Sequence, residues 1–106
     1  MTTRELLLDE FAVVSFTEVV TASGLSAAEF DELIELGTCE PCRLEGGERF
    51  FPASTIDLAR TARQLHIDFE LPLVGVALVL AYRDRIRELE ERLRQLECQL
   101  PTGLRD

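Results

Sequence analysis

The stretch between Pro72 and Pro101 constrains the fold more than any other part of the sequence, because no proline interrupts it. Pro72 suits the first turn of a helix, where its missing amide costs no hydrogen bond. The stretch predicts one helix of about 29 residues, about 43 Å long at 1.5 Å per residue. In a chain of 106 residues, this leaves room for one small further domain. We expect that domain at residues 1–71, and the helix with a short tail at residues 72–106.

The two halves of this helix differ in pattern. Residues 73–81 are apolar on all sides, which predicts burial on more than one side. From residue 79 onward, apolar side chains recur at alternating spacings of three and four, as in the seam between paired helices. The pattern predicts a dimerisation surface made of Val79, Tyr82, Ile86, Leu89, Leu93, Leu96 and Leu100. The alternative is one amphipathic helix packed along its own domain, although little chain remains to cover the seam.

Charged residues beside the seam leave the direction of the helix pair open. A parallel pair would place Arg85 opposite Glu90, and Arg92 opposite Glu97, which is favourable. Each exposed ion pair contributes only about 0.2–1 kcal/mol. Burial against the domain should therefore decide between parallel and antiparallel pairing.

Three serine motifs predict where helices begin in the smaller domain. In a capping box, the serine hydroxyl accepts a hydrogen bond from the amide three residues on, and the acid there accepts one from the serine amide. The motifs stand at residues 15–18, 26–29 and 54–57. Glycines close the first two predicted helices, at Gly24 and Gly37. Two short helices joined by a tight glycine turn form a helix-turn-helix.

Residues 38–52 predict a β-hairpin, because two short extended arms flank Gly46 and Gly47. Such a hairpin behind a helix-turn-helix is a wing, and residues 11–14 are a candidate third strand. A third helix over about residues 55–66 would have an inner face of Ile56, Ala59, Ala62 and His66, with Arg60 and Arg63 nearer to solvent. The expected fold is mainly α: a winged helix-turn-helix with a long C-terminal dimerisation helix.

The predicted helix-turn-helix half carries the whole negative charge of the protein. Residues 1–59 hold three arginines and twelve acidic residues, a balance of −9, whereas residues 60–106 hold eight of each. No basic residue lies between Ser15 and Leu36. Because DNA binding depends on cationic side chains that neutralise phosphates, we expect no nucleic-acid partner. A protein partner with a basic surface fits better.

The cysteines and the single histidine do not indicate a catalytic, redox or metal-binding site. Cys39 and Cys42 form a C-x-x-C motif, but a structural zinc needs four ligands, and only Cys98 and His66 remain. A redox C-x-x-C begins a helix, whereas this one lies in the predicted hairpin. We expect no catalytic residue, no cofactor and no metal. A thiol or metal sensor built on the three cysteines stays open as an alternative.

The expected location is the cytoplasm, with reduced thiols. The first five residues do not begin a secretory signal. The apolar run over residues 71–82 is shorter than the ~20 residues that span a bilayer, so we expect no membrane association.

The order of these elements resembles that of MerR-like regulators, and the residues resemble a narrower group among them, the CbpM-like chaperone modulators. The similarity extends over about residues 16–100 and is most specific at residues 33–37, 40–41, 56–66 and 68–78. The resemblance implies a non-enzymatic regulator that binds the J-domain of a DnaJ-like or CbpA-like co-chaperone and prevents it from stimulating Hsp70. It also implies an antiparallel homodimer.

Candidate J-domain contacts are acidic side chains of the second helix and of the segment before Pro72. At ~100° per residue, the second helix has an apolar side and an opposite acidic side. The candidates are Asp31, Glu32, Glu35, Asp68 and Glu70. One alternative is that these acids only keep the surface soluble. Another is a MerR-like DNA-binding transcriptional regulator, although DNA-binding MerR proteins usually carry basic and tyrosine residues on this helix.

Overall fold

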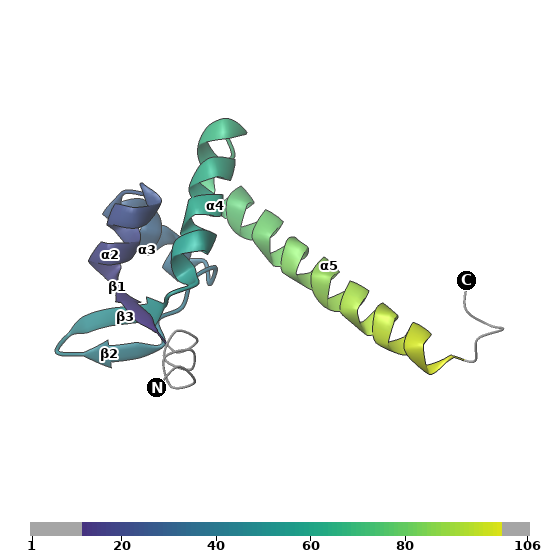
Figure 1. The fold of residues 1–106 in the computed structure, drawn as a ribbon. Coiled ribbons are helices and arrows are strands. Elements are labelled where there is room, and N and C mark those ends of the chain that lie inside the picture. Colours follow the sequence, from purple (N-terminus) through teal and green to yellow (C-terminus); the bar gives the residue numbers. More distant parts are fainter. Residues whose placement is uncertain (1–11, 101–106) are drawn as a thin grey trace.

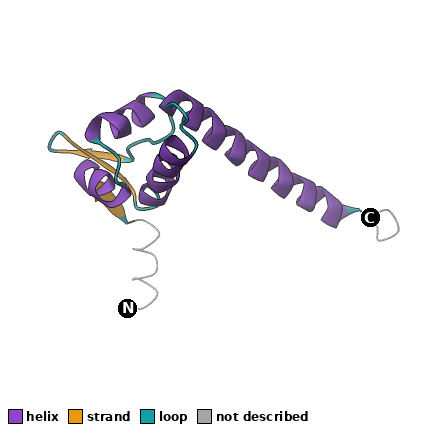
Figure 2. Ribbon diagram, turned by 90° about the horizontal axis from the view of Figure 1, so that it is seen from above, coloured by secondary structure: helices purple, strands orange, loops and turns teal. Residues whose placement is uncertain are grey.

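The computed structural model describes residues 12–100, which form a small domain and one projecting helix (Figure 1). The elements in chain order are β1 (Val13–Ser15), α2 (Phe16–Ser23), α3 (Ala27–Glu35), β2 (Arg43–Glu45), β3 (Glu48–Pro52), α4 (Thr55–Asp68) and α5 (Leu73–Gln99). Seen from above, α5 leaves the domain as a nearly straight rod (Figure 2). The predicted mainly α, winged helix-turn-helix fold is confirmed.

The first two predicted capping boxes are present and begin α2 and α3. The Ser15 hydroxyl accepts a hydrogen bond from the Glu18 amide, and the Glu18 carboxylate accepts one from the Ser15 amide, both at 3.1 Å. Ser26 and Glu29 form the same reciprocal pair, at 3.1 and 2.8 Å. Gly24 ends α2 in the left-handed conformation, with φ of 85°. The tight turn between the two helices therefore follows from local sequence.

The third predicted capping box, at residues 54–57, is wrong. Ser54 already has helical backbone angles, φ −61° and ψ −17°, and its side chain makes no capping hydrogen bond. The amide of Ile56 instead donates to the carbonyl of Ala53 at 3.2 Å, so a backbone turn satisfies this end of α4. Helix α4 also continues two residues beyond its predicted end, to Asp68.

The wing is an antiparallel sheet in the order β1-β3-β2. Val14 pairs with Phe51 on one side of β3, and Leu44 pairs with Arg49 on the other. Gly46 and Gly47 have φ of 59° and 79°, the positive pair that a two-residue hairpin turn requires. The first arm is shorter than predicted, because only residues 43–45 form a strand. The candidate third strand is displaced by about one residue, and Phe11 lies outside the described residues.

Two phenylalanine rings form the centre of the core. Phe30 and Phe51 are completely buried, with ring centroids 5.0 Å apart, and Phe16 lies 5.0 Å from Phe30 on the other side. Helix α4 contributes Ala59 and Ala62, and α5 contributes Leu73, Val76 and Leu80. The first turns of α5 thus pack into the domain core, which fixes the direction in which the helix leaves.

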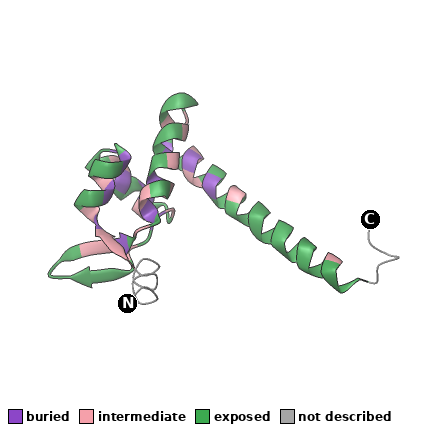
Figure 3. Cartoon of the chain, viewed as in Figure 1, coloured by how far each residue is buried: buried purple, intermediate pink, exposed green. Residues whose placement is uncertain are grey.

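The prediction that residues 73–81 are buried on more than one side is wrong for the single chain. Leu73, Val76 and Leu80 are at most 6% exposed, whereas Val74 and Leu78 are 52% and 55% exposed. Only one face of α5 contacts the domain, where it packs against α3 and α4. Figure 3 shows buried residues on α5 only near its start. Within residues 12–100, no helix is both long enough and apolar enough to cross a membrane.

Candidate interaction surfaces

Helix α3 turns its acidic side chains away from the core. Phe30 and Leu33 are fully buried, and Ile34 is half-buried. The three acids on the opposite side are exposed: Asp31, Glu32 and Glu35. The second helix of the helix-turn-helix therefore presents an anionic surface, with the sidedness that the sequence predicts.

One of these three acids is engaged within the chain. Asp31 Oδ1 lies 3.0 Å from Arg49 Nη1 of the wing, and the Arg49 guanidinium lies 4.6 Å from the ring centroid of Phe16. This contact joins α3, β3 and α2. Glu32 and Glu35 have no ion pair with any residue in the range 12–100. The sequence patterns did not reveal this distinction, because the Asp31–Arg49 pair joins two elements far apart in the chain.

The four arginines of residues 12–72 all make contacts within the chain. Arg43 pairs with Glu45 at 3.5 Å and lies 5.5 Å from the ring centroid of Phe50. Arg60 and Arg63 each donate from Nε, at 3.2 Å, to the carbonyls of Ala22 and Gly24. They join α4 to the end of α2 and the turn that follows. With Arg49 on Asp31, every arginine in residues 12–72 has a partner in the chain, and a contact with phosphate would compete with these interactions.

The end of α4 and the segment that follows it expose the remaining two candidate acids. Asp68 and Glu70 are exposed, and no residue in the described range 12–100 pairs with either. Glu70 has φ of 52°, a left-handed conformation that is uncommon for a residue other than glycine. Ile67 and Phe69 alternate with these acids and are 50% and 67% exposed. This corner thus presents apolar and anionic groups together.

His66 fixes the corner by contacts with two other elements. Its Nδ1 lies 2.6 Å from the Leu71 carbonyl, and its Nε2 lies 3.3 Å from Glu29 Oε2 at the start of α3. The hydrogen bond from the Ser26 amide lowers the pKa of Glu29 below its ordinary value, and the Ser26 side chain and His66 lower it further. His66 therefore joins the end of α4 to the start of α3 and to the segment before α5.

The predicted seam lies on the side of α5 opposite the docked face. At ~100° per residue, the seam positions from Tyr82 to Leu96 lie about 150° around the helix from the docked face, and Val79 lies nearer to that face. Its members are 41% to 66% exposed: Val79, Tyr82, Ile86, Leu89, Leu93, Leu96 and Leu100. The alternative in which the seam packs along its own domain is wrong, because this surface faces away from the domain.

Ion pairs on α5 form along the helix. Glu88 is contacted by Arg85 at 3.2 Å and by Arg92 at 2.9 Å. Arg94 contacts Glu91 at 2.6 Å. These i,i+3 and i,i+4 pairs stabilise the projecting helix modestly. Because these pairs lie within one helix, they do not show whether two α5 helices would pair in parallel or antiparallel, and the antiparallel pairing stays a prediction.

The cysteines occupy three different environments. Cys39 is buried in the core, and this burial raises the pKa of its thiol to about 11, whereas Cys42 is exposed. Cys98 is exposed near the far end of α5. The C-x-x-C spacing thus sends one thiol into the core and the other to solvent. Among residues 12–100, no group of three or more histidine, cysteine or acidic side chains is arranged to hold a metal.

These elements define a class of protein: a winged helix-turn-helix domain that carries a long C-terminal helix with an exposed apolar seam. A family model described as the MerR helix-turn-helix family of regulatory proteins matches residues 14–98, and the chain belongs to this family. The match includes both the domain and most of the long helix. No curated protein matches the chain.

Proposed function

We propose that this MerR-family chain is a dimeric, non-enzymatic regulator that binds a basic protein surface, the J-domain of a DnaJ-like or CbpA-like co-chaperone, and blocks its stimulation of Hsp70. The observation that carries the proposal is the anionic outer face of α3, where Glu32 and Glu35 are exposed and lack an ion pair in the described chain. The choice of a J-domain rests on the sequence resemblance to CbpM-like chaperone modulators.

Inhibition would follow from occupying the surface that Hsp70 needs. J-domains present a positively charged helix to Hsp70, and carboxylates on α3 or at the α4–α5 corner would attract that helix. The available acids are Glu32 and Glu35 on α3, and Asp68 and Glu70 at the corner. Such an inhibitor needs no reaction chemistry, since binding alone excludes the other protein.

The dimer in this proposal is formed by the α5 seam. Six apolar side chains on one face of α5 and Leu100, which directly follows the helix in an extended conformation, are all at least 41% exposed and form a surface larger than isolated exposed residues explain. A second copy offers the same surface and would bury both. The family resemblance favours antiparallel pairing of the two α5 helices.

A second candidate function is DNA binding, which the family match itself favours, because the matched region includes the helix-turn-helix and the wing. The charge distribution of the domain opposes DNA binding. The two wing arginines, Arg43 and Arg49, pair with Glu45 and Asp31, so contacts with phosphates would require these pairs to break.

One binding experiment separates the two candidates. The full chain is titrated against a purified J-domain and against duplex DNA by fluorescence anisotropy, at about 0.05 and about 0.3 M salt. The proposal predicts J-domain binding that weakens as salt rises, and no DNA binding near physiological salt. Submicromolar DNA affinity without J-domain binding would replace the proposal by the second candidate.

A further inference from the structure

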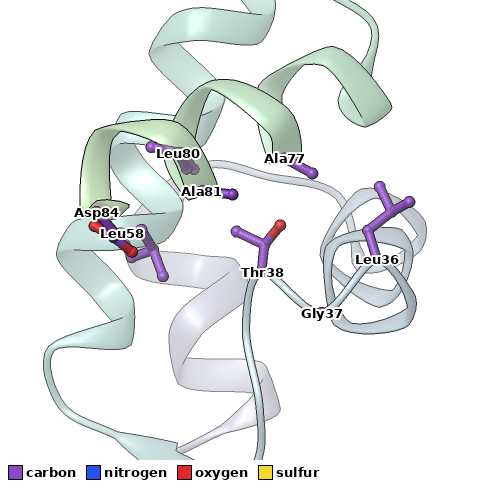
Figure 4. Close-up of a pocket in the computed structure, with 8 residues that line it drawn as sticks. All are labelled: Leu36, Gly37, Thr38, Leu58, Ala77, Leu80, Ala81 and Asp84. Atoms are coloured by element: carbon purple, nitrogen blue, oxygen red, sulfur yellow. The ribbon is translucent and has the colours of Figure 1, made fainter. Parts of the chain in front are cut away.

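A pocket of about 170 Å³ lies where the end of α3 approaches α4 and α5 (Figure 4). Ala77 and Ala81 project toward it from α5, and Thr38 lies across from them. Leu36 is at one end of the pocket, and Asp84 is at the other. The small side chains of α5 create this space, because alanines stand where larger residues would fill it.

The pocket combines an apolar wall with an anionic end. Leu36, Leu80 and the two alanines supply the apolar contacts. The polar groups are the Thr38 hydroxyl and the Asp84 carboxylate, and Asp84 has no ion pair within residues 12–100. A ligand with a hydrocarbon stem and a cationic head would match both parts of the site. An anionic ligand would be repelled at the Asp84 end.

The pocket also adjoins the surface of the proposed function. Leu36 directly follows Glu35, so the pocket lies at the carboxyl end of the acidic face of α3. Ala77, Leu80 and Asp84 belong to the side of α5 that faces the domain, whereas the seam faces away. A second copy on the seam would therefore leave the pocket open to a partner that contacts α3.

We propose that this pocket receives one arginine or lysine side chain of the protein partner. Its methylene stem would pack on Ala77 and Ala81, and its cation would pair with Asp84. Only the source of this side chain rests on the proposed function. The match between stem, cation and pocket rests on the residues of this chain.

The pocket is tested first without any protein partner. The full chain, with labelled methyl groups, is titrated by NMR with butylguanidinium, which mimics an arginine side chain, and with neutral butanol. We expect saturable shifts at the pocket methyls, with the cation binding about threefold more tightly than the alcohol. Asp84→Asn should remove this preference, whereas Asp57→Asn, at an exposed acid paired with Arg60, should not. A cation that shifts no pocket methyl, or that binds Asp84→Asn equally well, overturns the inference.

The second test fills the pocket. Ala81 is exposed, so Ala81→Phe should place a ring in the pocket while the domain remains folded, which thermal unfolding checks. J-domain affinity should fall about tenfold, as for the loss of an interface anchor. Gln64→Phe, on an exposed position of α4, is the matched control.

The outcomes separate this inference from the proposed function. If the J-domain binds wild type and Ala81→Phe equally, the pocket is not its contact and the inference is wrong, while the proposed function stands. If the J-domain binds neither protein, the proposed function is wrong, and the butylguanidinium titration alone decides whether the pocket accepts a basic side chain.

Discussion

The winged domain buries its large apolar side chains, whereas the outer half of α5 exposes them. In the domain, Phe30 and Phe51 have no exposed surface and belong to a core cluster that also contains residues of α4 and of the start of α5. Beyond residue 84, no residue of α5 is buried, and its leucines are exposed to solvent (Figure 3). The domain completes its own core, whereas the helix leaves an apolar surface exposed, which the proposed dimer would bury.

Charge separates the same two regions. In the domain, the arginines hold elements together, and Glu32 and Glu35 are left without partners in the described chain. On α5, arginines and acids pair along one helix. This difference is the basis of the two proposed roles, in which the seam pairs with a copy of the chain and the acidic domain binds a basic partner.

The largest expected effect comes from opening the domain core. Phe51→Ala should destabilise the domain by about 3–5 kcal/mol, since it removes a fully buried ring in contact with Phe30. Urea unfolding, followed by circular dichroism, measures the loss. Leu44→Ala, at a 68% exposed wing position, is the control and should change stability by less than about 0.5 kcal/mol. If Phe51→Ala lowers the free energy of unfolding by less than about 1 kcal/mol, the claim that Phe51 lies in the centre of the core is wrong.

The second-largest expected effect is the loss of the proposed dimer when a charge is placed in the seam. Leu89→Asp or Leu93→Asp places an unpaired carboxylate in the proposed apolar interface, where it costs several kcal/mol, so each variant should be monomeric with an intact domain. Gln95→Asp, on the other side of α5, should remain dimeric. Sedimentation velocity gives the mass of each. A wild-type chain that is already monomeric at micromolar concentration would contradict the account of α5, as would dimers in both leucine variants.

Local sequence predicted much of the domain. Two helices begin at capping hydrogen bonds made by Ser15 and Ser26 with residues three positions on. Turns form where glycine adopts a positive φ, at residues 24, 37, 46 and 47. The same logic failed at Ser54, because the end of β3 leads directly into a helical turn in which Ser54 already has helical angles. A Ser-x-x-acid pattern does not encode the conformation of the preceding residues.

Contacts between distant residues could not be predicted in this way. The Asp31–Arg49 pair and the His66 bridge to Glu29 depend on how α3 meets the wing and α4. The pocket beside Asp84 depends on the same packing. The apolar row of α5 could be predicted, because its spacing lies within one helix, whereas its role in dimerisation stays a prediction. The face of α5 that docks on the domain could not be predicted, because it depends on the fold.

A smaller effect should appear in the dependence of domain stability on pH. The pKa of Glu29 is lower in the folded protein than its ordinary value of 4.5, so its contribution is present above that value and is lost as pH falls through the folded pKa. Glu29→Gln keeps the capping hydrogen bond but cannot titrate. As pH falls from about 5 to about 3, the variant should lose less stability than wild type. Equal losses in urea titrations would contradict the role given to this carboxylate.

The most direct test of the central claim is the inhibition of J-domain-stimulated ATP hydrolysis by Hsp70. Two double variants reverse the charge of the exposed acidic pairs: Glu32→Lys with Glu35→Lys, and Asp68→Lys with Glu70→Lys. The control makes the same change of charge on the wing, with Glu45→Lys and Glu48→Lys. The account predicts that at least one of the first two raises the half-inhibitory concentration about tenfold or more, while the control inhibits as wild type does. Equal inhibition by wild type and by both double variants would contradict the claim that these acids hold the partner.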